Sequence, residues 1–279
     1  MKRLVIIVLV LLSTNSFGQT VQQLIDKVDL NNLELTVSEF SGEQSTTVNG
    51  TNVTILNRQH GNNDLAAQYI KEKFLALDNI TVSEQDFNTT GKNIIAIQEG
   101  LTNPNDIYLV CAHYDTMADY CADDNATGTA AVIEIARILS EQCLDNTIVY
   151  ALWDEEEIGL RGSKFYAQNA AANNQNILGV INLDMMGYDS DADGEPGENT
   201  FDIDVRDLHG SLTIKDDLLA LLNTYTFNLN VEVVNPGTTA SDHAQFWNNG
   251  FPAVLVGESW ETNDETPYYH SSGDRLSTI

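Results

Sequence analysis

Apolar, strand-like runs alternate along the chain with segments of helical periodicity, and this alternation limits the folds that the sequence can adopt. Buried strands are predicted at residues 106–112, 147–153, 177–183 and 252–257. The clearest helix, residues 127–141, lies between the first two of them. Apolar strands separated by helices are typical of a sheet that is covered on both sides. We therefore expect an α/β fold with a doubly wound, mostly parallel central sheet and helices on both of its faces.

The rest of the chain is consistent with a single domain over residues 19–279. It shows no internal repeat and no interdomain linker. Two polar stretches, residues 41–61 and the acidic residues 189–207, are predicted to be loops. The hydrophobic pattern predicts further helices at residues 19–40, 64–77, 162–172, 211–225 and 242–247, and strands at residues 80–87, 93–98 and 231–234.

Residues 1–18 have the features of a secretory signal peptide. Lys2 and Arg3 precede an apolar run at residues 4–12, and Ser16-Phe17-Gly18 supplies small residues around a cleavage point. The apolar run is too short to span a bilayer, and no later segment resembles a membrane span. We therefore expect a secreted or periplasmic protein.

The chain is strongly acidic, with a formal net charge of −28. Such a charge repels nucleic acid and anionic membrane surfaces, so neither is an expected partner. The three cysteines, Cys111, Cys121 and Cys143, are an odd number, so at least one thiol is free or intermolecular. A 121–143 bridge is not expected, because the helix predicted between them would be about 22 Å long. A bridge between Cys111 and Cys121 stays open.

Side chains that can bind metal follow the predicted buried strands. In an open α/β sheet the carboxyl ends of the strands form one edge, where ligands bind. Carboxylates gathered there would raise one another's pKa unless a cation were present. Imidazoles with carboxylates suit zinc, and a carboxylate between two ions suits a two-metal hydrolase. The alternatives are a buried histidine–carboxylate pair and a solvated acidic rim. The residues are His113, Asp115, Asp124, residues 154–157, Asp184 and His270.

Five motifs occur in order along the chain: HYD, ADDNATG, EEEIGLRGS, NLDMMG and YYHSSGD. This series resembles that of the co-catalytic zinc aminopeptidases related to bacterial leucyl aminopeptidase. Glutamate carboxypeptidases and glutaminyl cyclases are relatives of the same family. The resemblance covers residues 93–274 and implies a zinc-exopeptidase-like fold.

The resemblance also implies roles for individual residues. His113 and Asp184 would bind one zinc ion, Glu157 and His270 would bind a second, and Asp124 would bridge the two. Asp115 would orient His113, and Glu156 would be the general base. A cis peptide is implied between Asp124 and Asn125.

The chain departs from the family pattern at three places. Some relatives carry a Cys-x-x-x-Cys loop with a substrate-contacting tyrosine, where this chain has Pro236-Gly-Thr-Thr-Ala240. Cys121 stands where glycine is usual. Relatives continue into a terminal helix beyond the position of Ile279, which leaves open a missing C-terminal helix. The oxyanion contact and the specificity pocket are therefore not predicted.

The favoured function is a secreted zinc aminopeptidase that acts on peptides with a free N-terminus. An acidic edge suits an α-ammonium group better than a substrate carboxylate. The resemblance adds a preference for apolar first residues. The alternatives are a glutaminyl cyclase-like transferase with a single zinc ion, and a non-catalytic binding module that kept the fold.

Several further residues carry weaker signals. Asp189, Asp191 and Asp193, followed by glycine, resemble the first half of a calcium loop, although its twelfth position would be threonine. A calcium site there is weighed against a solvated acidic turn. His243 is expected to be structural. Glu258 could line a pocket, and Tyr268 and Tyr269 could be either pocket walls or packing residues.

Overall fold

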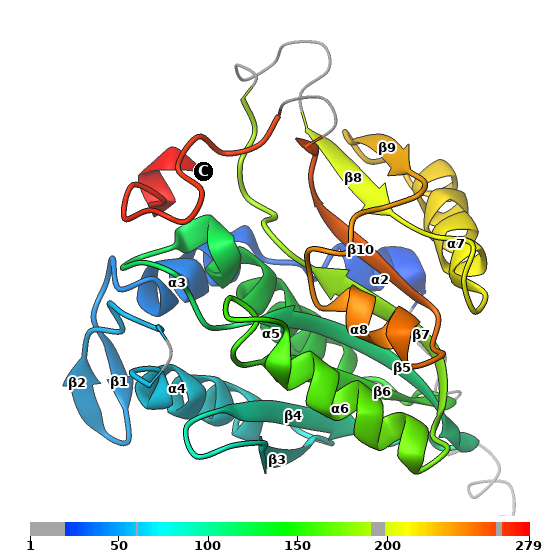
Figure 1. The fold of residues 1–279 in the computed structure, drawn as a ribbon, viewed down its shortest axis with the longest axis horizontal. Helices are drawn as coiled ribbons and strands as arrows, with labels where there is room; N and C mark the ends of the chain where they lie inside the picture. The colour runs from blue at the N-terminus through cyan, green and yellow to red at the C-terminus, as the bar shows by residue number, and fades with distance from the viewer. Residues whose placement is uncertain (1–19, 60, 191–198, 261–263) are drawn as a thin grey trace, which may run out of the picture.

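The computed structural model describes residues 20–59, 61–190, 199–260 and 264–279 (Figure 1). The predicted signal peptide lies outside the described residues, as do Asp191 and Asp193 of the candidate calcium site. Asp189 is described, and its Oδ2 accepts a hydrogen bond from the backbone N–H of Asn199 at 2.7 Å. No helix among these residues is long and apolar enough to cross a membrane.

An eight-stranded sheet forms the centre of the molecule. Its four central strands run parallel to one another, in the order β6, β5, β7 and β10. The order across the whole sheet is β3 (Thr81–Asp86), β4 (Lys92–Gln98), β6 (Asn146–Trp153), β5 (Asn103–His113), β7 (Asn176–Leu183), β10 (Ala253–Glu258), β8 (Thr200–Asp204) and β9 (Asn230–Val234).

The expected α/β fold with a covered central sheet is confirmed, and the sheet is mixed towards both edges. Strand β4 is antiparallel to β3 and to β6, and β8 is antiparallel to β10. The loop between β3 and β4 is too short for a crossover, so these two strands can pair only in the antiparallel sense.

Helices cover both faces of the sheet. Side chains alternate along β4, so Ile94 and Ala96 join one hydrophobic cluster while Ile95 joins the other. The first cluster contains residues of α3 (Leu30–Phe40), α4 (Asp64–Leu75) and α5 (Gly128–Leu139), and the second contains residues of α6 (Arg161–Ala172) and α8 (His243–Asn248). Helix α7 (Ser211–Thr224) packs against the first cluster, and α2 (Val21–Ile25) precedes α3.

Two of the predicted loops contain strands. Residues 41–61 include an antiparallel hairpin of β1 (Thr46–Val48) and β2 (Thr51–Val53). Its turn residues, Asn49 and Gly50, have φ values of 51° and 72°, which are typical of the Asn-Gly hairpin turn. Strand β8 lies within the predicted acidic loop 189–207. Asp202 and Asp204 alternate in it with the apolar residues Phe201 and Ile203. The acidic composition of the segment obscures this strand-like alternation.

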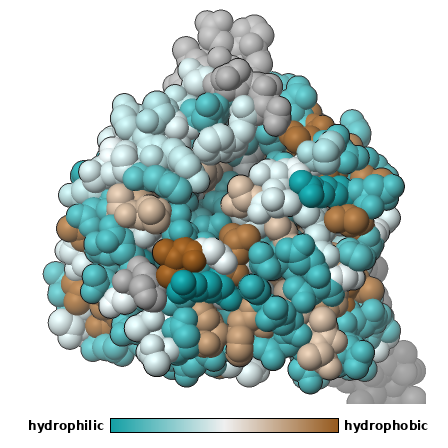
Figure 2. Space-filling model, in the orientation of Figure 1, coloured by the Kyte–Doolittle hydropathy of each residue, from teal (hydrophilic) through white to brown (hydrophobic). Residues whose placement is uncertain are grey.

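The three cysteines are free thiols, so the bridge that stayed open between Cys111 and Cys121 is not formed. Both of these residues are buried, whereas Cys143 is exposed. The view in Figure 2 shows a mostly hydrophilic surface with a hollow near its middle.

A fully buried arginine connects three segments of the chain. Arg58 is 0% exposed and donates hydrogen bonds to four backbone carbonyls. The acceptors are Phe40 at the end of α3, Tyr114, Tyr120 and Cys121, at distances from 2.7 to 3.0 Å. The last three flank the loop between β5 and α5, so Arg58 positions the segment that carries the predicted metal ligands.

Replacement of Arg58 by methionine should lower the free energy of unfolding by about 3 kcal/mol or more, because buried carbonyls lose their donor. Urea unfolding monitored by circular dichroism measures the effect. Lys71→Met is the control: Lys71 forms a surface ion pair with Glu84, and its loss should cost less than about 1 kcal/mol. Equal effects of the two substitutions would contradict the role assigned to Arg58.

Candidate metal centre

The predicted metal ligands come together at the carboxyl edge of the parallel strands. His113 is the last residue of β5, and Asp184 follows the last residue of β7. Glu156 and Glu157 lie in the loop that follows β6. Because neighbouring parallel strands end side by side, residues far apart in the sequence meet here.

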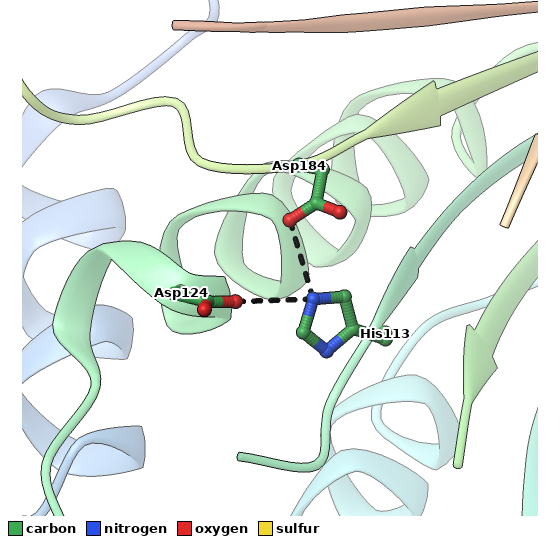
Figure 3. Close-up of side chains that lie close together, drawn as sticks. All are labelled: His113, Asp124 and Asp184. Atoms are coloured by element: carbon green, nitrogen blue, oxygen red, sulfur yellow. Dashed lines mark hydrogen bonds and ion pairs between the residues drawn. The ribbon is translucent and has the colours of Figure 1, made fainter. Parts of the chain in front are cut away.

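A first group of ligand atoms surrounds one imidazole nitrogen. His113 Nε2 lies 3.2 Å from Asp124 Oδ1 and 3.2 Å from Asp184 Oδ1 (Figure 3). The ligand atoms of the three residues lie within 4.8 Å of one another. Ser241 Oγ donates to Asp184 Oδ2 at 2.6 Å and thereby orients the other carboxylate oxygen towards His113. These donors could hold one metal ion.

A second group shares Asp124 with the first. His270 Nε2 lies 3.4 Å from Asp124 Oδ2 and 3.0 Å from Glu157 Oε2, and the three residues again offer ligand atoms within 4.8 Å. Asp124 thus directs one oxygen to each imidazole. Asp124 Oδ2 and Glu157 Oε1 are buried without a hydrogen-bond donor among the described residues.

The backbone around Asp124 is held by a residue that sequence reasoning left without a role. Asp274 accepts hydrogen bonds from the N–H groups of Asp123 at 2.8 Å and Asp124 at 2.9 Å. Asn125 Nδ2 donates to the carbonyl of Leu183, just before Asp184, at 3.0 Å. The Asp124–Asn125 peptide is cis, as the family resemblance implied, and lies at a kink with non-helical backbone angles in the segment Ala122–Thr127 that leads into α5.

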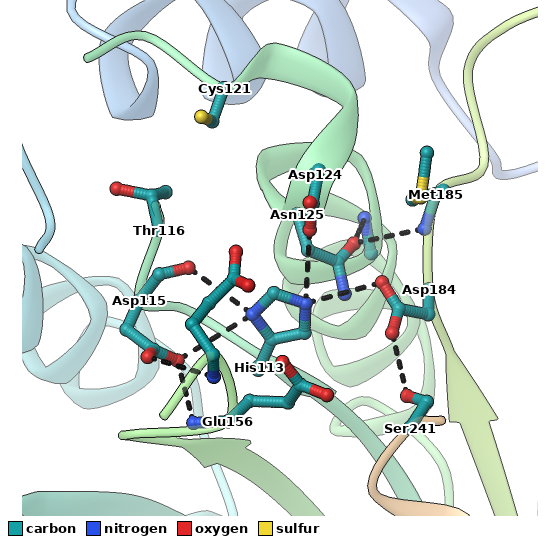
Figure 4. A network of polar contacts seen from close by, with 12 residues as sticks. His113, Asp115, Thr116, Cys121, Asp124, Asn125, Glu156, Asp184, Met185 and Ser241 are labelled. Carbon is teal, nitrogen blue, oxygen red and sulfur yellow. Dashed lines mark hydrogen bonds and ion pairs between the residues drawn. The ribbon is translucent and has the colours of Figure 1, made fainter. Parts of the chain in front are cut away.

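Asp115 connects the histidine to the two glutamates (Figure 4). Its carboxylate accepts hydrogen bonds from the N–H groups of Glu156 at 3.0 Å and Glu157 at 3.3 Å. His113 Nδ1 lies 3.2 Å from the backbone oxygen of Asp115 and 3.6 Å from its Oδ1. With Nδ1 donating to this carbonyl, Nε2 is left to face the metal position. Asp115 therefore positions His113 and also the loop of Glu156 and Glu157.

His243 does not belong to either ligand group. Its Nε2 lies 3.0 Å from the carbonyl oxygen of Thr238, and its ring packs edge-on against Trp247. Burial lowers the pKa of His243 to about 4, so the ring is neutral. The expectation that it is structural agrees with these contacts.

Comparison with known proteins supplies the family. Residues 93–279 match the family model described as "Peptidase family M28". The chain belongs to peptidase family M28. The match includes both groups of candidate ligands.

One curated relative of this M28 chain is leupeptin-inactivating enzyme 1 of Streptomyces exfoliatus, which is 31% identical over 249 residues. The alignment covers 80% of this chain and 53% of the relative, so the chain spans about half of that protein's length.

Solved structures confirm the fold. The LapA aminopeptidase of Legionella pneumophila superposes with a TM-score of 0.76 at 19% identity, covering 96% of this chain and 72% of LapA. Glutaminyl cyclase of Porphyromonas gingivalis superposes with a TM-score of 0.61 at 18% identity, covering 91% and 92%. The fold is thus shared by an aminopeptidase and a cyclase, and the site residues must separate the two activities.

The donor atoms suit a divalent metal ion, and without one the negative charge of the carboxylates would be poorly balanced. Burial raises the pKa of Glu157 to about 9, and the carboxylate of Asp124 adds to this effect. Burial likewise raises the pKa of Glu156. Burial opposes a charge on His113, but the carboxylates of Asp184 and Glu156 raise its pKa overall. A cation bound among these groups would offset the repulsion between the carboxylates. It would also provide a partner for the buried oxygens of Asp124 and Glu157 that receive no hydrogen bond from the described residues.

Metal-free protein should lose stability as pH rises from about 6 to about 9. The raised pKa values of Glu157 and His113 mean that the folded state binds more protons than the unfolded state in this range, so unfolding is favoured as protons leave. The expected loss is at least about 1 kcal/mol, measured by urea unfolding after chelation.

Glu157→Gln in the same assay should show a shallower pH dependence, because one of the titrating groups is gone. Added zinc should stabilise the wild type more at the higher pH, since the ligands bind metal when deprotonated. Metal-free stability that rises between these two pH values would contradict the proposed charge crowding.

Proposed function

We propose that this protein is a metallo-aminopeptidase that removes the N-terminal residue of peptides through a two-zinc site. The observation that carries the proposal is the position of Asp124, whose two oxygens face the imidazoles of His113 and His270. A carboxylate in this position can bridge two divalent ions, as in two-metal hydrolases. Asp184 completes one ligand group and Glu157 the other, and both groups offer the nitrogen and oxygen donors that zinc prefers.

Zinc, when bound, would supply Lewis acidity that polarises the scissile carbonyl and makes water more acidic. Glu156 lies with His113 and Glu157 in one cluster of ligand atoms, and we assign it the proton transfer. Its carboxylate accepts a proton from the attacking water, whose hydroxyl adds to the acyl carbon. Glu156 then gives this proton to the amine that leaves when the C–N bond breaks. Burial raises the pKa of Glu156, which makes it a better proton acceptor.

Peptides with a free N-terminus are the substrates that suit the charge of the site. The α-amino group is a cation, and the described residues at the strand ends are dominated by carboxylates. Together with the predicted signal peptide at residues 1–18, this supports action outside the cytoplasm, in a secreted or periplasmic setting.

A single-zinc glutaminyl cyclase-like transferase is the rival function. The complete second set of ligands favours the hydrolase, because a single-zinc reaction has no need of both His113 with Asp184 and His270 with Glu157.

Glu156→Gln separates the proposed base from the neighbouring ligand. The glutamine keeps the shape of the side chain but cannot accept the proton, so kcat for leucyl-4-nitroanilide should fall by about 100-fold or more while zinc content is unchanged. Glu157→Gln is the matched control. It should lower the zinc content, measured by elemental analysis, because a charged ligand is lost.

N-acetyl-leucyl-4-nitroanilide serves as the substrate control and should not be cleaved by the wild type. An active Glu156→Gln enzyme would overturn the assignment of the base. Cleavage of the acetylated amide at the same rate as the free one would overturn aminopeptidase action.

A further inference from the structure

Glu258, the last residue of β10, lies on the wall of a cavity beside the candidate metal centre. The cavity has a volume of about 250 Å³, and Asp184 and Tyr269 also line it. Glu258 is nevertheless only 4% exposed. A carboxyl group that is buried to this degree is costly to desolvate unless it has hydrogen-bond partners or gives up its charge. The partners of Glu258 therefore indicate what it does.

One oxygen of Glu258 binds the segment that leads to His270. Glu258 Oε2 accepts a hydrogen bond from the N–H of Thr266 at 2.8 Å. The hydroxyl oxygen of Thr266 in turn accepts one from the N–H of Tyr268 at 3.3 Å. Thr266 is 2% exposed, so this contact lies inside the fold. Glu258 thus holds the chain shortly before one of the candidate metal ligands.

The carboxyl group of Glu258 is also hydrogen-bonded to that of Asp123, the residue before the bridging Asp124. Glu258 Oε1 and Asp123 Oδ2 are both buried, and neither receives a hydrogen bond from an N–H or hydroxyl group of the described residues. These two oxygens are therefore the pair that can share a proton. Two buried carboxyl groups form such a bond only when one of them is protonated, because two carboxylates would repel each other.

The contacts of the two side chains place this proton on Glu258. Asp123 Oδ1 accepts a hydrogen bond from the N–H of Gly187 at 2.8 Å, which favours a carboxylate at Asp123. Burial and the hydrogen bond with Asp123 raise the pKa of Glu258 to about 11. Burial also raises the pKa of Asp123, but the hydrogen bonds from Glu258 and Gly187 oppose this rise. Glu258 is thus the neutral donor and Asp123 the acceptor.

The pair of Asp123 and Glu258 joins three segments that carry candidate ligands. Asp123 directly precedes Asp124, and Gly187 belongs to the loop that begins with Asp184. Thr266 belongs to the segment that ends at His270. Residues of both ligand groups therefore depend on these hydrogen bonds for their relative position.

We propose that Glu258 is a positioning residue of the metal centre, which donates a hydrogen bond to Asp123 and accepts one from Thr266. It thereby fixes the loop of Asp124 against the segment of His270. The inference rests on the proposed two-zinc function. Loss of a hydrogen-bond partner behind the metal ligands typically lowers metal affinity or activity by about 10- to 100-fold. The rival role for Glu258 is a charged wall residue that binds the substrate's α-ammonium group.

Glu258→Gln and Glu258→Leu separate these roles. The glutamine amide can donate to Asp123 and accept from Thr266 but carries no charge, whereas leucine does neither. Calorimetric titration of zinc into metal-free protein should give two bound ions for the wild type and for Glu258→Gln, with dissociation constants within about threefold of each other. Glu258→Leu should bind at least one of the ions about tenfold or more weakly. The zinc concentration for half-maximal cleavage of leucyl-4-nitroanilide should rise with it.

Two further variants guard against a general loss of folding. Glu134 of α5 is a buried carboxyl group that accepts hydrogen bonds from Arg137 and from the N–H of Asp29. Glu134→Leu should lower the free energy of unfolding but leave both zinc dissociation constants unchanged. Glu258→Asp keeps the carboxyl group on a shorter side chain that cannot reach both partners. It should weaken zinc binding by about tenfold even if Glu258→Leu does not fold.

Three results would count against these assignments. Zinc binding by Glu258→Asp or Glu258→Leu that equals that of the wild type would overturn the positioning role. A Glu258→Gln enzyme that holds two zinc ions but has a KM for leucyl-4-nitroanilide about tenfold higher would show a charged contact with the substrate instead. A wild type that binds a single zinc ion at saturation would overturn the two-zinc function itself, whatever the variants do.

Discussion

The site depends on the position of the Asp124 carboxylate between two imidazoles. One carboxylate oxygen faces His113 and the other faces His270, at 3.2 and 3.4 Å. These imidazoles come from segments at opposite ends of the matched family region. The rest of the edge holds Asp124 in place, through the backbone contacts to Asp274 and the amide of Asn125. Without this arrangement the two ligand groups would share no residue.

The site also crowds several negatively charged groups together inside the fold. Buried carboxylates repel one another, and the raised pKa values of Glu156 and Glu157 are the consequence. The parallel strands place the side chains at one edge, and Arg58 binds the loop beside them through four carbonyls. Metal then completes a site that the protein builds at a cost to its own stability.

The sequence was most informative where chemistry is local. Each predicted ligand follows a strand or begins a helix, so the short motifs that contain His113, Glu157 and Asp184 could be placed at one edge of a sheet. Contacts between distant segments could not be predicted in this way. Asp274 lies 150 residues from the N–H of Asp124 to which it bonds, and Ser241 lies 57 residues from Asp184. The residues next to Asp274 and Ser241 in the sequence give no indication of these partners.

Strand β8, which lies between β10 and the edge strand β9, shows a second limit. Its sequence was predicted to be part of an acidic loop, because the charges of Asp202 and Asp204 concealed the apolar alternation. In the structure the same alternation separates a core face from a cavity face. A central parallel strand is recognisable from its continuous apolar run, whereas a strand with one acidic face can resemble a loop. The segment is acidic, as the sequence shows, but it includes a strand where a loop was expected.

The central claim is that Asp124 bridges two metal ions. Anomalous diffraction at the zinc absorption edge, from crystals of the zinc-loaded protein, tests it most directly. The account predicts two zinc peaks about 3.5–4 Å apart, one beside His113 and Asp184 and the other beside Glu157 and His270, with Asp124 bound to both. A single zinc peak at saturating metal, or two peaks of which Asp124 binds only one, would contradict it.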